Sequence, residues 1–513
     1  MLIKTYAAAL VGVDAQLVTI EVNVSNGVRF MLVGLPDKAV NESAERIRSA
    51  FHEMKVKWPR KQVVINMSPA DLKKEGTAYD LPIAIGVMAA SGFLEAEQIG
   101  EYLIMGELSL DGSLQPIKGA LPIAIKAREL GFKGFILPRA NALEAAIVNN
   151  LDVYGADTIS EVVDHLSGKA SLEPTQVDTR AEFARHQELF TDDYADVKGQ
   201  ESVKRALEVA SAGGHNIILV GPPGSGKSMM IKRLPSILPP LTLSEALETT
   251  KIHSVAGRLG HVGALIAQRP FRAPHHTISN VAMVGGGTFP QPGEISLAHN
   301  GVLFLDEFPE FSRPVLEVLR QPLEDRQIAI SRAKTSVVYP ASFMLAASMN
   351  PCPCGYYNHP DRECVCGGGA VQRYLGRISG PLMDRIDIQI EITPVPFDKL
   401  SERTSSEPSA AIRERVIRAR MIQEERFREE SSVHCNAQMS SRLLSRHSML
   451  ADDSLQCLKQ AMERLNLSAR AYDRILKVAR TIADLDGSAD IQLPHIAEAI
   501  TYRSLDRADW GLL

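Results

Sequence analysis

The chain has 513 residues, enough for roughly three domains of about 150 residues each. Hydrophobic residues make up 45% and charged residues 23%, and the formal net charge is −5. This balance is that of an ordinary water-soluble globular protein. It excludes a protein that coats nucleic acid with an overall basic surface, so any nucleic-acid surface has to be local.

Polar residues interrupt every apolar run before it reaches membrane-spanning length, and the first residues lack a charged region followed by a long apolar core. Six cysteines in a chain of this length do not indicate a disulfide scaffold. We therefore expect a cytoplasmic protein with no membrane partner.

The pattern of apolar runs and turn residues divides the chain into three domains. Residues 1–168 combine strand-like runs, such as 63–67, with helix-like stretches, which predicts an α/β domain, and residues 169–190 are a polar linker. Strands and helices alternate through 191–396, as in a parallel-sheet nucleotide-binding core. Residues 397–513 begin with a Ser-, Thr- and charge-rich linker and are otherwise predicted to be helical.

The most specific motif follows the apolar run 217–220 and precedes a stretch that can form a helix. This is the strand–GxxxxGK[ST]–helix context of a phosphate-binding loop. Glycine has no Cβ, so main-chain N–H groups can converge on phosphate oxygens. Lys227 is expected to bridge the β- and γ-phosphates, and Ser228 to ligate Mg²⁺. The loop consists of Gly221, Pro222, Pro223, Gly224, Ser225, Gly226, Lys227 and Ser228.

Two further apolar strands end in polar side chains that suit NTP hydrolysis. Residues 302–305 lead to Asp306, which is expected to hold Mg²⁺, and to Glu307, which is expected to orient and deprotonate the attacking water. Residues 343–347 lead to Asn350, a candidate sensor of the γ-phosphate.

Arg385 lies in the segment 381–387. If the phosphate loop lies on the far side of the sheet, Arg385 is too distant from its own phosphates and reaches those of a neighbouring subunit as an arginine finger. A structural ion pair with Asp384 or Asp387 is the alternative, and the spacing leaves the two near even.

Together these motifs resemble the AAA+ ATPases, and in particular the Mg-chelatase-like branch known as the ComM/YifB family. The resemblance also extends to residues 270–277, 293–301 and 350–355 and covers nearly the whole chain. It implies a hexameric ring with ATP at the subunit interfaces, in which Asn350 is sensor 1, Arg385 the finger in trans and Arg470 the sensor 2 of the lid. Family members related to ComM are associated with branch migration of DNA during natural transformation.

No acidic residue occurs between Glu248 and Glu294, an interval that contains Arg258 and Arg269. A basic, glycine-punctuated insert of this kind is suited to tracking a nucleic-acid backbone. A solvated loop whose lack of acids is partly chance is the alternative.

Residues 327–339 alternate around a polar centre, which predicts a β-hairpin with Arg332 and Lys334 at its tip. In related ring motors a hairpin at this place points into the pore, so the resemblance implies that a threaded strand passes these two residues. An exposed edge hairpin with protective charges is the alternative. Because no aromatic cluster accompanies the charges, we expect backbone contacts, weak sequence preference and strong salt dependence.

Four of the cysteines form two C-x-C pairs, Cys352 with Cys354 and Cys364 with Cys366, separated by nine residues. Four thiolates can close a tetrahedral zinc site. The spacing departs from the usual C-x₂₋₄-C, and iron–sulfur ligation, a redox disulfide and plain reduced thiols remain alternatives.

Residues 105–117 and the helix predicted at 119–131 resemble the proteolytic domain of Lon. Lon-type proteolysis needs a serine nucleophile and a lysine base. The corresponding positions hold Ala78 and Leu121, so we expect the fold without the protease. The domain is then free for assembly, docking or a second DNA contact.

The predicted architecture is α/β: a Lon-protease-like N-terminal domain, an AAA+ parallel-sheet core and a helical lid of the Mg-chelatase C-terminal type. The predicted function is that of a hexameric DNA motor that uses ATP, Mg²⁺ and Zn²⁺ and acts on branched or single-stranded DNA. A chelatase-like protein-remodelling ATPase is the alternative, and Ala78 and Leu121 argue against an ATP-dependent protease.

Overall fold

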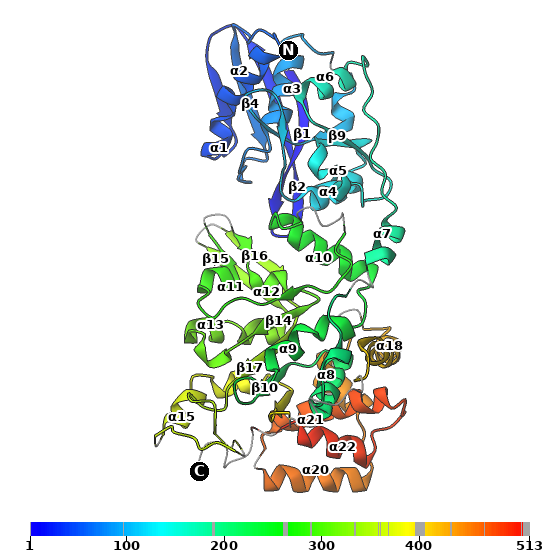
Figure 1. Cartoon of the computed structure of the whole chain (residues 1–513). Coiled ribbons are helices and arrows are strands. Elements are labelled where there is room, and N and C mark those ends of the chain that lie inside the picture. The colour runs from blue at the N-terminus through cyan, green and yellow to red at the C-terminus, as the bar shows by residue number, and fades with distance from the viewer. Residues whose placement is uncertain are drawn as a thin grey trace. The chain divides into compact units, whose positions relative to one another are not determined.

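The computed structural model describes the chain in two compact units (Figure 1). The N-terminal unit comprises Met1–His186 together with Leu243–Ala267 and Ser331–Tyr339, and the C-terminal unit comprises Gln187–Thr242, Gln268–Ile330 and Pro340–Leu513. The description omits residues 1, 96, 187–189, 260–264, 288–289, 333–334, 358, 360, 368, 396–405, 431–432, 466, 504 and 506–513. Across the described residues, no helix combines the length and apolarity needed to cross a bilayer.

A mixed sheet of seven strands forms the centre of the N-terminal unit, in the order β3-β4-β2-β1-β5-β8-β9. β1 and β2 pair antiparallel along their whole length, and Gly12, with φ +66°, supplies the left-handed residue that their tight turn needs. The strands are β1 (Leu2–Val11), β2 (Asp14–Ser25), β3 (Phe30–Val33), β4 (Gln62–Ser68), β5 (Tyr102–Ile104), β8 (Gly134–Pro138) and β9 (Asp152–Ala156), with a separate ribbon of β6 (Glu107–Leu108) and β7 (Leu114–Gln115).

The helices of this unit differ in how much of their surface is apolar. α3 is buried at every residue because its sequence after Asp80 is apolar all round, whereas α2 and α6 each have a polar outer face. The helices are α1 (Lys38–Asn41), α2 (Ser43–Glu53), α3 (Asp80–Ala90), α4 (Ala120–Glu129), α5 (Arg139–Ala145), α6 (Ile159–Leu166), α7 (Thr179–His186) and α10 (Leu243–Val255).

Two findings differ from the sequence-based expectation. The polar stretch interpreted as a linker contains α7, whose start is stabilised because the Asp178 carboxylate accepts the main-chain N–H groups of Arg180 and Ala181. In addition, residues 243–267, expected within the nucleotide-binding core, belong to the N-terminal unit. There α10 packs on α4, and the main-chain N–H of Gly119 donates to the carbonyl of Ser254 at 3.1 Å.

A parallel sheet of five strands forms the centre of the C-terminal unit, in the order β11-β14-β17-β10-β18. The three middle strands are buried at every residue, which is why their sequences are continuous apolar runs instead of alternating ones. The strands are β11 (Phe271–Arg272), β14 (Val302–Leu305), β17 (Met344–Met349), β10 (Ile217–Val220) and β18 (Ile388–Glu391). This confirms the parallel-sheet core predicted from the sequence.

The helices next to this sheet are mostly short. They are α8 (Glu201–Gly213), α9 (Lys227–Lys232), α11 (Asn280–Val284), α12 (Glu294–Leu297), α13 (Arg313–Glu317), α14 (Arg320–Asp325), α15 (Ala370–Leu375) and α16 (Gly380–Met383). A small ribbon of β12 (Gly285–Gly286) with β13 (Gln291–Pro292) accompanies them. A second ribbon pairs β15 (Gln327–Arg332) with β16 (Thr335–Pro340), and its residues Ser331–Tyr339 belong to the N-terminal unit. The second ribbon confirms the predicted hairpin.

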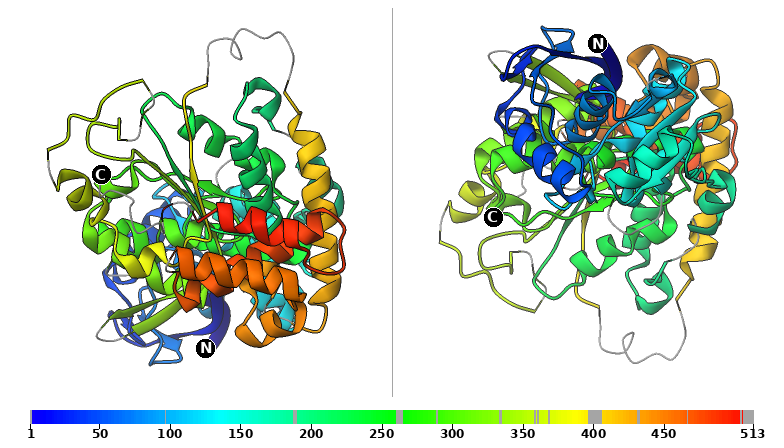
Figure 2. Two further views of the ribbon diagram at one scale, coloured as in Figure 1. Left: turned by 90° about the horizontal axis from the view of Figure 1, so that it is seen from below. Right: turned by 90° about the horizontal axis from the view of Figure 1, so that it is seen from above.

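The C-terminal part of the chain is helical, as predicted. α21 packs against α8, α18 and α22. Figure 2 shows the orange and red C-terminal helices beside the gold helix α18. The helices are α18 (Ser409–Arg426), α19 (Ser441–His447), α20 (Asp452–Arg464), α21 (Ala469–Leu485) and α22 (Leu493–Thr501).

A buried ion pair joins the helical part to the sheet. Asp387, which is 1% exposed and directly precedes β18, accepts a hydrogen bond from Arg474 of α21 at 2.8 Å and one from the main chain of Asn216 at 2.9 Å. Burial alone raises the pKa of Asp387, but the charge of Arg474, the nearby His215 ring and the hydrogen bond from the main chain of Asn216 hold that pKa well below its ordinary value. The carboxylate is therefore ionised at neutral pH and depends on Arg474.

We expect Arg474→Ala to destabilise the protein by about 3–5 kcal/mol, because it leaves the Asp387 carboxylate buried without its cation. Arg470→Ala is the matched control: Arg470 lies one turn earlier on α21, pairs with Asp384 at 3.2 Å and is 68% exposed. Its loss should cost less than about 1 kcal/mol. Thermal unfolding of the full chain followed by circular dichroism measures both, and equal shifts of the midpoint would contradict this account.

Candidate nucleotide-binding site

The phosphate loop connects β10 to α9. Its glycines Gly224 and Gly226 have φ values of +78° and +89°, a region that residues with a Cβ rarely adopt. The Lys227 ammonium donates hydrogen bonds to the carbonyls of Gly221 at 2.7 Å and Pro222 at 2.9 Å. Burial lowers the pKa of Lys227, and the nearby Asp306 carboxylate opposes that shift. The loop thus surrounds a buried cation.

Strand register brings the polar residues of three strand ends together. In the pairing of β10 with β17, Val220 lies opposite Met349, and in the pairing of β14 with β17, Leu305 lies opposite Ala347. The next residue along each strand therefore emerges at the same edge of the sheet: Gly221, Asn350 and Asp306.

Direct contacts join these residues. The Asn350 Oδ1 accepts a hydrogen bond from Lys227 at 3.3 Å, and the Ser228 hydroxyl donates to Asp306 Oδ2 at 2.6 Å. Ser348, on β17, donates to the other carboxylate oxygen of Asp306. The arrangement of one ammonium, two hydroxyls and one carboxylate is chemically suited to a phosphate with a divalent cation.

Ser348 was missed by sequence reasoning. It is completely buried and lies within the small-residue run of β17. The sequence offers no signal for it, because a serine in such a run is indistinguishable from a packing residue until its neighbour across the sheet is known.

Glu307 directly follows Asp306 and has a φ of +54°. Its side chain is 60% exposed, and its Oε2 lies 3.2 Å from Nδ1 of His276. The His276 ring is 4.1 Å from that of His275. His276 follows β11, so it reaches the site from the neighbouring strand; sequence reasoning counted it only as part of a basic insert.

Arg385 forms neither of the ion pairs offered as its alternative role. Its guanidinium pairs with Glu324 of α14 and donates to the carbonyl of Pro381 at 2.6 Å. Asp384 pairs with Arg470, and Asp387 with Arg474. Arg385 and Glu324 also line a hollow of about 480 Å³ that includes Arg320.

The four clustered cysteines lie together, as their spacing predicts. The Sγ atoms of Cys352 and Cys354 are 3.3 Å apart, those of Cys352 and Cys364 are 3.7 Å apart, and those of Cys354 and Cys364 are 3.6 Å apart. The four sulfur atoms, including that of Cys366, lie within 4.8 Å of one another, and all are free thiols. A redox disulfide is therefore not present in this arrangement.

The residues predicted to contact DNA occupy different surroundings. Arg258 is exposed. Arg269, also predicted to contact DNA, donates to the main-chain carbonyls of Pro239 at 2.7 Å, Asn300 at 2.8 Å and Pro240 at 3.1 Å, so its guanidinium is hydrogen-bonded to the fold. At the hairpin tip, Lys334 and the side chain of Arg332 lie outside the described residues.

The N-terminal unit carries no nucleophile–base pair at the positions that correspond to those of Lon. Ala78 has no side-chain functional group, and Leu121 is fully buried in α4. The carboxylate of Glu144 accepts the Leu121 N–H at 3.0 Å and the hydroxyl of Ser254 at 2.5 Å. Burial raises the pKa of Glu144, and these hydrogen bonds oppose the shift. The start of α4 is thus a packing site for α10.

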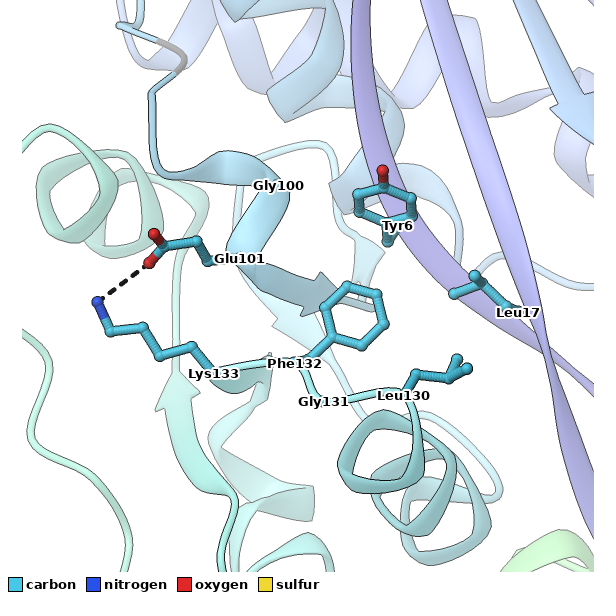
Figure 3. A pocket seen from close by; sticks show the side chains of 8 residues that line it. All are labelled: Tyr6, Leu17, Gly100, Glu101, Leu130, Gly131, Phe132 and Lys133. Atoms are coloured by element: carbon cyan, nitrogen blue, oxygen red, sulfur yellow. Dashed lines mark hydrogen bonds and ion pairs between the residues drawn. The ribbon is translucent and has the colours of Figure 1, made fainter.

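The N-terminal unit also contains a hollow of about 640 Å³ (Figure 3). The rings of Tyr6 and Phe132 are 5.3 Å apart beside it, and an ion pair of 3.1 Å joins Lys133 to Glu101 at its rim. Its lining contains no thiol, imidazole or carboxylate pair, so it is not the candidate site.

Three family models of magnesium chelatase match successive parts of the chain. The model described as magnesium chelatase subunit ChlI matches residues 193–400, one described as subunit ChlI of Mg-chelatase matches 20–141, and one for the ChlI C-terminal region matches 406–503. The phosphate loop, the parallel sheet and these matches define the class: a Mg-chelatase-like AAA+ protein.

Similar proteins identify the family within this class. The competence protein ComM of Haemophilus influenzae is 45% identical over 505 residues, which cover 98% of this chain and 97% of that protein. The protein YifB of Escherichia coli is 43% identical over 506 residues, with the same coverage of 98% and 97%. The chain belongs to the ComM/YifB family, which confirms the resemblance seen in its motifs. Lon protease 2 of Bacillus subtilis is 30% identical over 154 residues, 27% of this chain and 26% of that protein.

Proposed function

We propose that the protein is an ATP-driven DNA motor that works as a hexameric ring on branched or single-stranded DNA. The observation that carries the nucleotide part is the convergence of Lys227, Ser228, Asp306 and Asn350 at one edge of the parallel sheet. The DNA part is supported by the similarity to a protein named for competence and by the exposed Arg258 in an interval without acids.

Each residue has a distinct part in the proposed hydrolysis of ATP. Lys227 neutralises the β- and γ-phosphates, and Ser228 and Asp306 hold Mg²⁺, which when bound offsets charge on the phosphate oxygens. Glu307 orients the attacking water and takes its proton. Asn350 follows β17 and contacts Lys227, so loss of the γ-phosphate changes a contact at the end of β17.

Arg385 and Arg470 act from outside this edge of the sheet. In the proposed ring, Arg385 leaves its ion pair with Glu324 and contacts the γ-phosphate of the neighbouring subunit as an arginine finger. Arg470, which is exposed and paired with Asp384, contributes as sensor 2 from the helical lid.

The DNA contacts assigned to this motor are backbone contacts. Arg258 and the hairpin residues Arg332 and Lys334 supply positive charge, while Arg269 keeps its main-chain partners. Phosphate contacts of this type give little sequence preference and a strong dependence on salt.

Zn²⁺ is the metal we assign to Cys352, Cys354, Cys364 and Cys366. A tetrahedral site with Zn–S bonds of about 2.3 Å places its sulfur atoms about 3.8 Å apart. The sulfur atoms of Cys352, Cys354 and Cys364 are 3.3–3.7 Å apart, and all four lie within 4.8 Å of one another, which suits a single ion. A multi-iron cluster would hold its thiolates farther apart, because iron and sulfide ions lie between them.

A second candidate function is remodelling of a protein partner. It is favoured by the three ChlI models, which together match all parts of the chain from residue 20 to 503 apart from two intervals. Stimulation of ATP turnover by a protein but by no DNA would select this candidate.

Glu307→Gln is expected to keep ATP binding and to lower ATP turnover by about 10²–10⁴-fold, because the amide cannot accept a proton from water. Phosphate release and equilibrium binding of a fluorescent ATP analogue measure the two effects. Glu414→Gln, which alters a carboxylate that is 72% exposed on α18, is the control and should match the wild type. Normal turnover by Glu307→Gln would remove Glu307 from the mechanism.

Arg385→Ala is expected to be inactive alone and to regain activity when mixed with inactive Lys227→Ala, because some interfaces then combine an intact phosphate loop with an intact finger. Glu324→Gln separates this role from a structural one: it breaks the observed ion pair, yet it should retain turnover. If Arg385→Ala and Glu324→Gln lose activity alike and no mixture recovers it, Arg385 is structural.

Arg332→Ala combined with Lys334→Ala is expected to abolish stimulation of ATP turnover by DNA and to leave the basal rate unchanged. Lys459→Ala combined with Arg464→Ala removes the same charge from the exposed side of α20 and should leave stimulation intact. If DNA still stimulated ATP turnover of the hairpin variant fully, the residues that bind DNA would lie elsewhere.

A further inference from the structure

The cysteine loop, which we define as residues 351–369, joins the nucleotide sensor to α15. It begins directly after Asn350 and ends where α15 starts at Ala370. Its described residues form turns and bends without helix or strand. A loop of this length inside a compact unit needs some other source of order, and a bound metal supplies it by fixing several points of the chain at once.

The cysteine loop has a small core of its own. Cys352 is fully buried and packs with Tyr357 and with Val371 of α15, and Leu375 and the other three cysteines lie against this cluster. The thiols thus lie between the loop and the helix that follows it, so an ion held by them fastens both.

The cysteine loop touches the phosphate loop directly. Gly355 has a φ of +84°, and its N–H closes a turn onto the carbonyl of Cys352 at 3.0 Å. A Cβ added at Gly355 would come within 2.5 Å of Cδ of Pro223. The turn between two of the thiols therefore rests against the second proline of the phosphate loop, with no room for a side chain.

Contacts on either side of the cysteine loop and α15 join them to the rest of the site. At its start, Asn350 accepts the hydrogen bond from Lys227. Beyond α15, Arg377 donates to the carbonyl of Pro309 at 3.3 Å and pairs with Glu310 at 2.8 Å. Pro309 and Glu310 belong to the turn that follows Glu307. The loop and its helix therefore contact the phosphate loop, the sensor and the segment after the proposed base.

From these contacts we infer that a single Zn²⁺ held by the four cysteines braces the phosphate loop and its sensor, so that nucleotide affinity and ATP turnover depend on the metal. The inference rests on the proposed ATP-hydrolysing function. The metal would then stabilise the cysteine loop itself and also control nucleotide binding at the neighbouring site.

The test uses the full-length protein purified under reducing conditions. Zinc per chain is measured by elemental analysis, nucleotide affinity by titration with a fluorescent ATP analogue, and ATP turnover by phosphate release without DNA. We expect about one zinc per chain in the wild type. Cys354→Ser and Cys364→Ser should lose the zinc, bind nucleotide at least about tenfold more weakly and turn over ATP at least about tenfold more slowly.

Cys457→Ser is the matched control, because Cys457 is a free thiol on α20 outside the cluster. It should keep zinc, affinity and turnover. Gly355→Ala keeps all four thiols and should retain zinc while it weakens nucleotide binding, because its methyl group meets Pro223. This variant tests the coupling even if the cysteine variants do not fold.

Wild-type protein without zinc would overturn the metal site. Zinc loss without any change in nucleotide affinity, or normal affinity in Gly355→Ala, would overturn the coupling. A wild type that binds zinc and nucleotide but shows no ATP turnover would instead contradict the proposed function, because zinc content and affinity are measured independently of hydrolysis.

Discussion

The nucleotide site depends on the parallel alignment of β10, β14 and β17. Because Val220 lies opposite Met349 and Leu305 opposite Ala347, the carboxyl ends of the three strands lie within two residues of the same level. A shift of one residue in either pairing would turn alternate side chains to the other face and separate Asp306 from Ser228. The apolar runs that bury these strands therefore also set the geometry of the proposed chemistry.

Much of this site was predictable because its residues adjoin strand ends. The phosphate loop, Asp306 and Asn350 each follow an apolar run, and parallel strands end at a common edge. The partners contributed by other elements were not predictable. Glu324 is remote in sequence from Arg385, and the carbonyls that bind Arg269 carry no sequence signal at all. Sequence patterns report local conformation and burial, whereas such partners are fixed only by tertiary packing.

The N-terminal unit holds no catalytic pair at the positions that correspond to those of Lon. Where Lon-type proteolysis needs a lysine, Leu121 is buried, and Glu144 instead holds the start of α4 and the hydroxyl of Ser254. The segment 243–267, which lies between the two nucleotide motifs in sequence, packs onto α4 within one compact unit.

The proposed function requires that DNA stimulates ATP turnover at this nucleotide site. The most direct measurement is the ATP turnover of the wild-type protein without DNA and with single-stranded DNA, duplex and a four-way junction, each at low and raised salt. The account predicts stimulation by single-stranded or branched DNA that weakens as salt rises, since the contacts are with phosphates. Equal turnover with and without every DNA at low salt would contradict it and favour a protein partner.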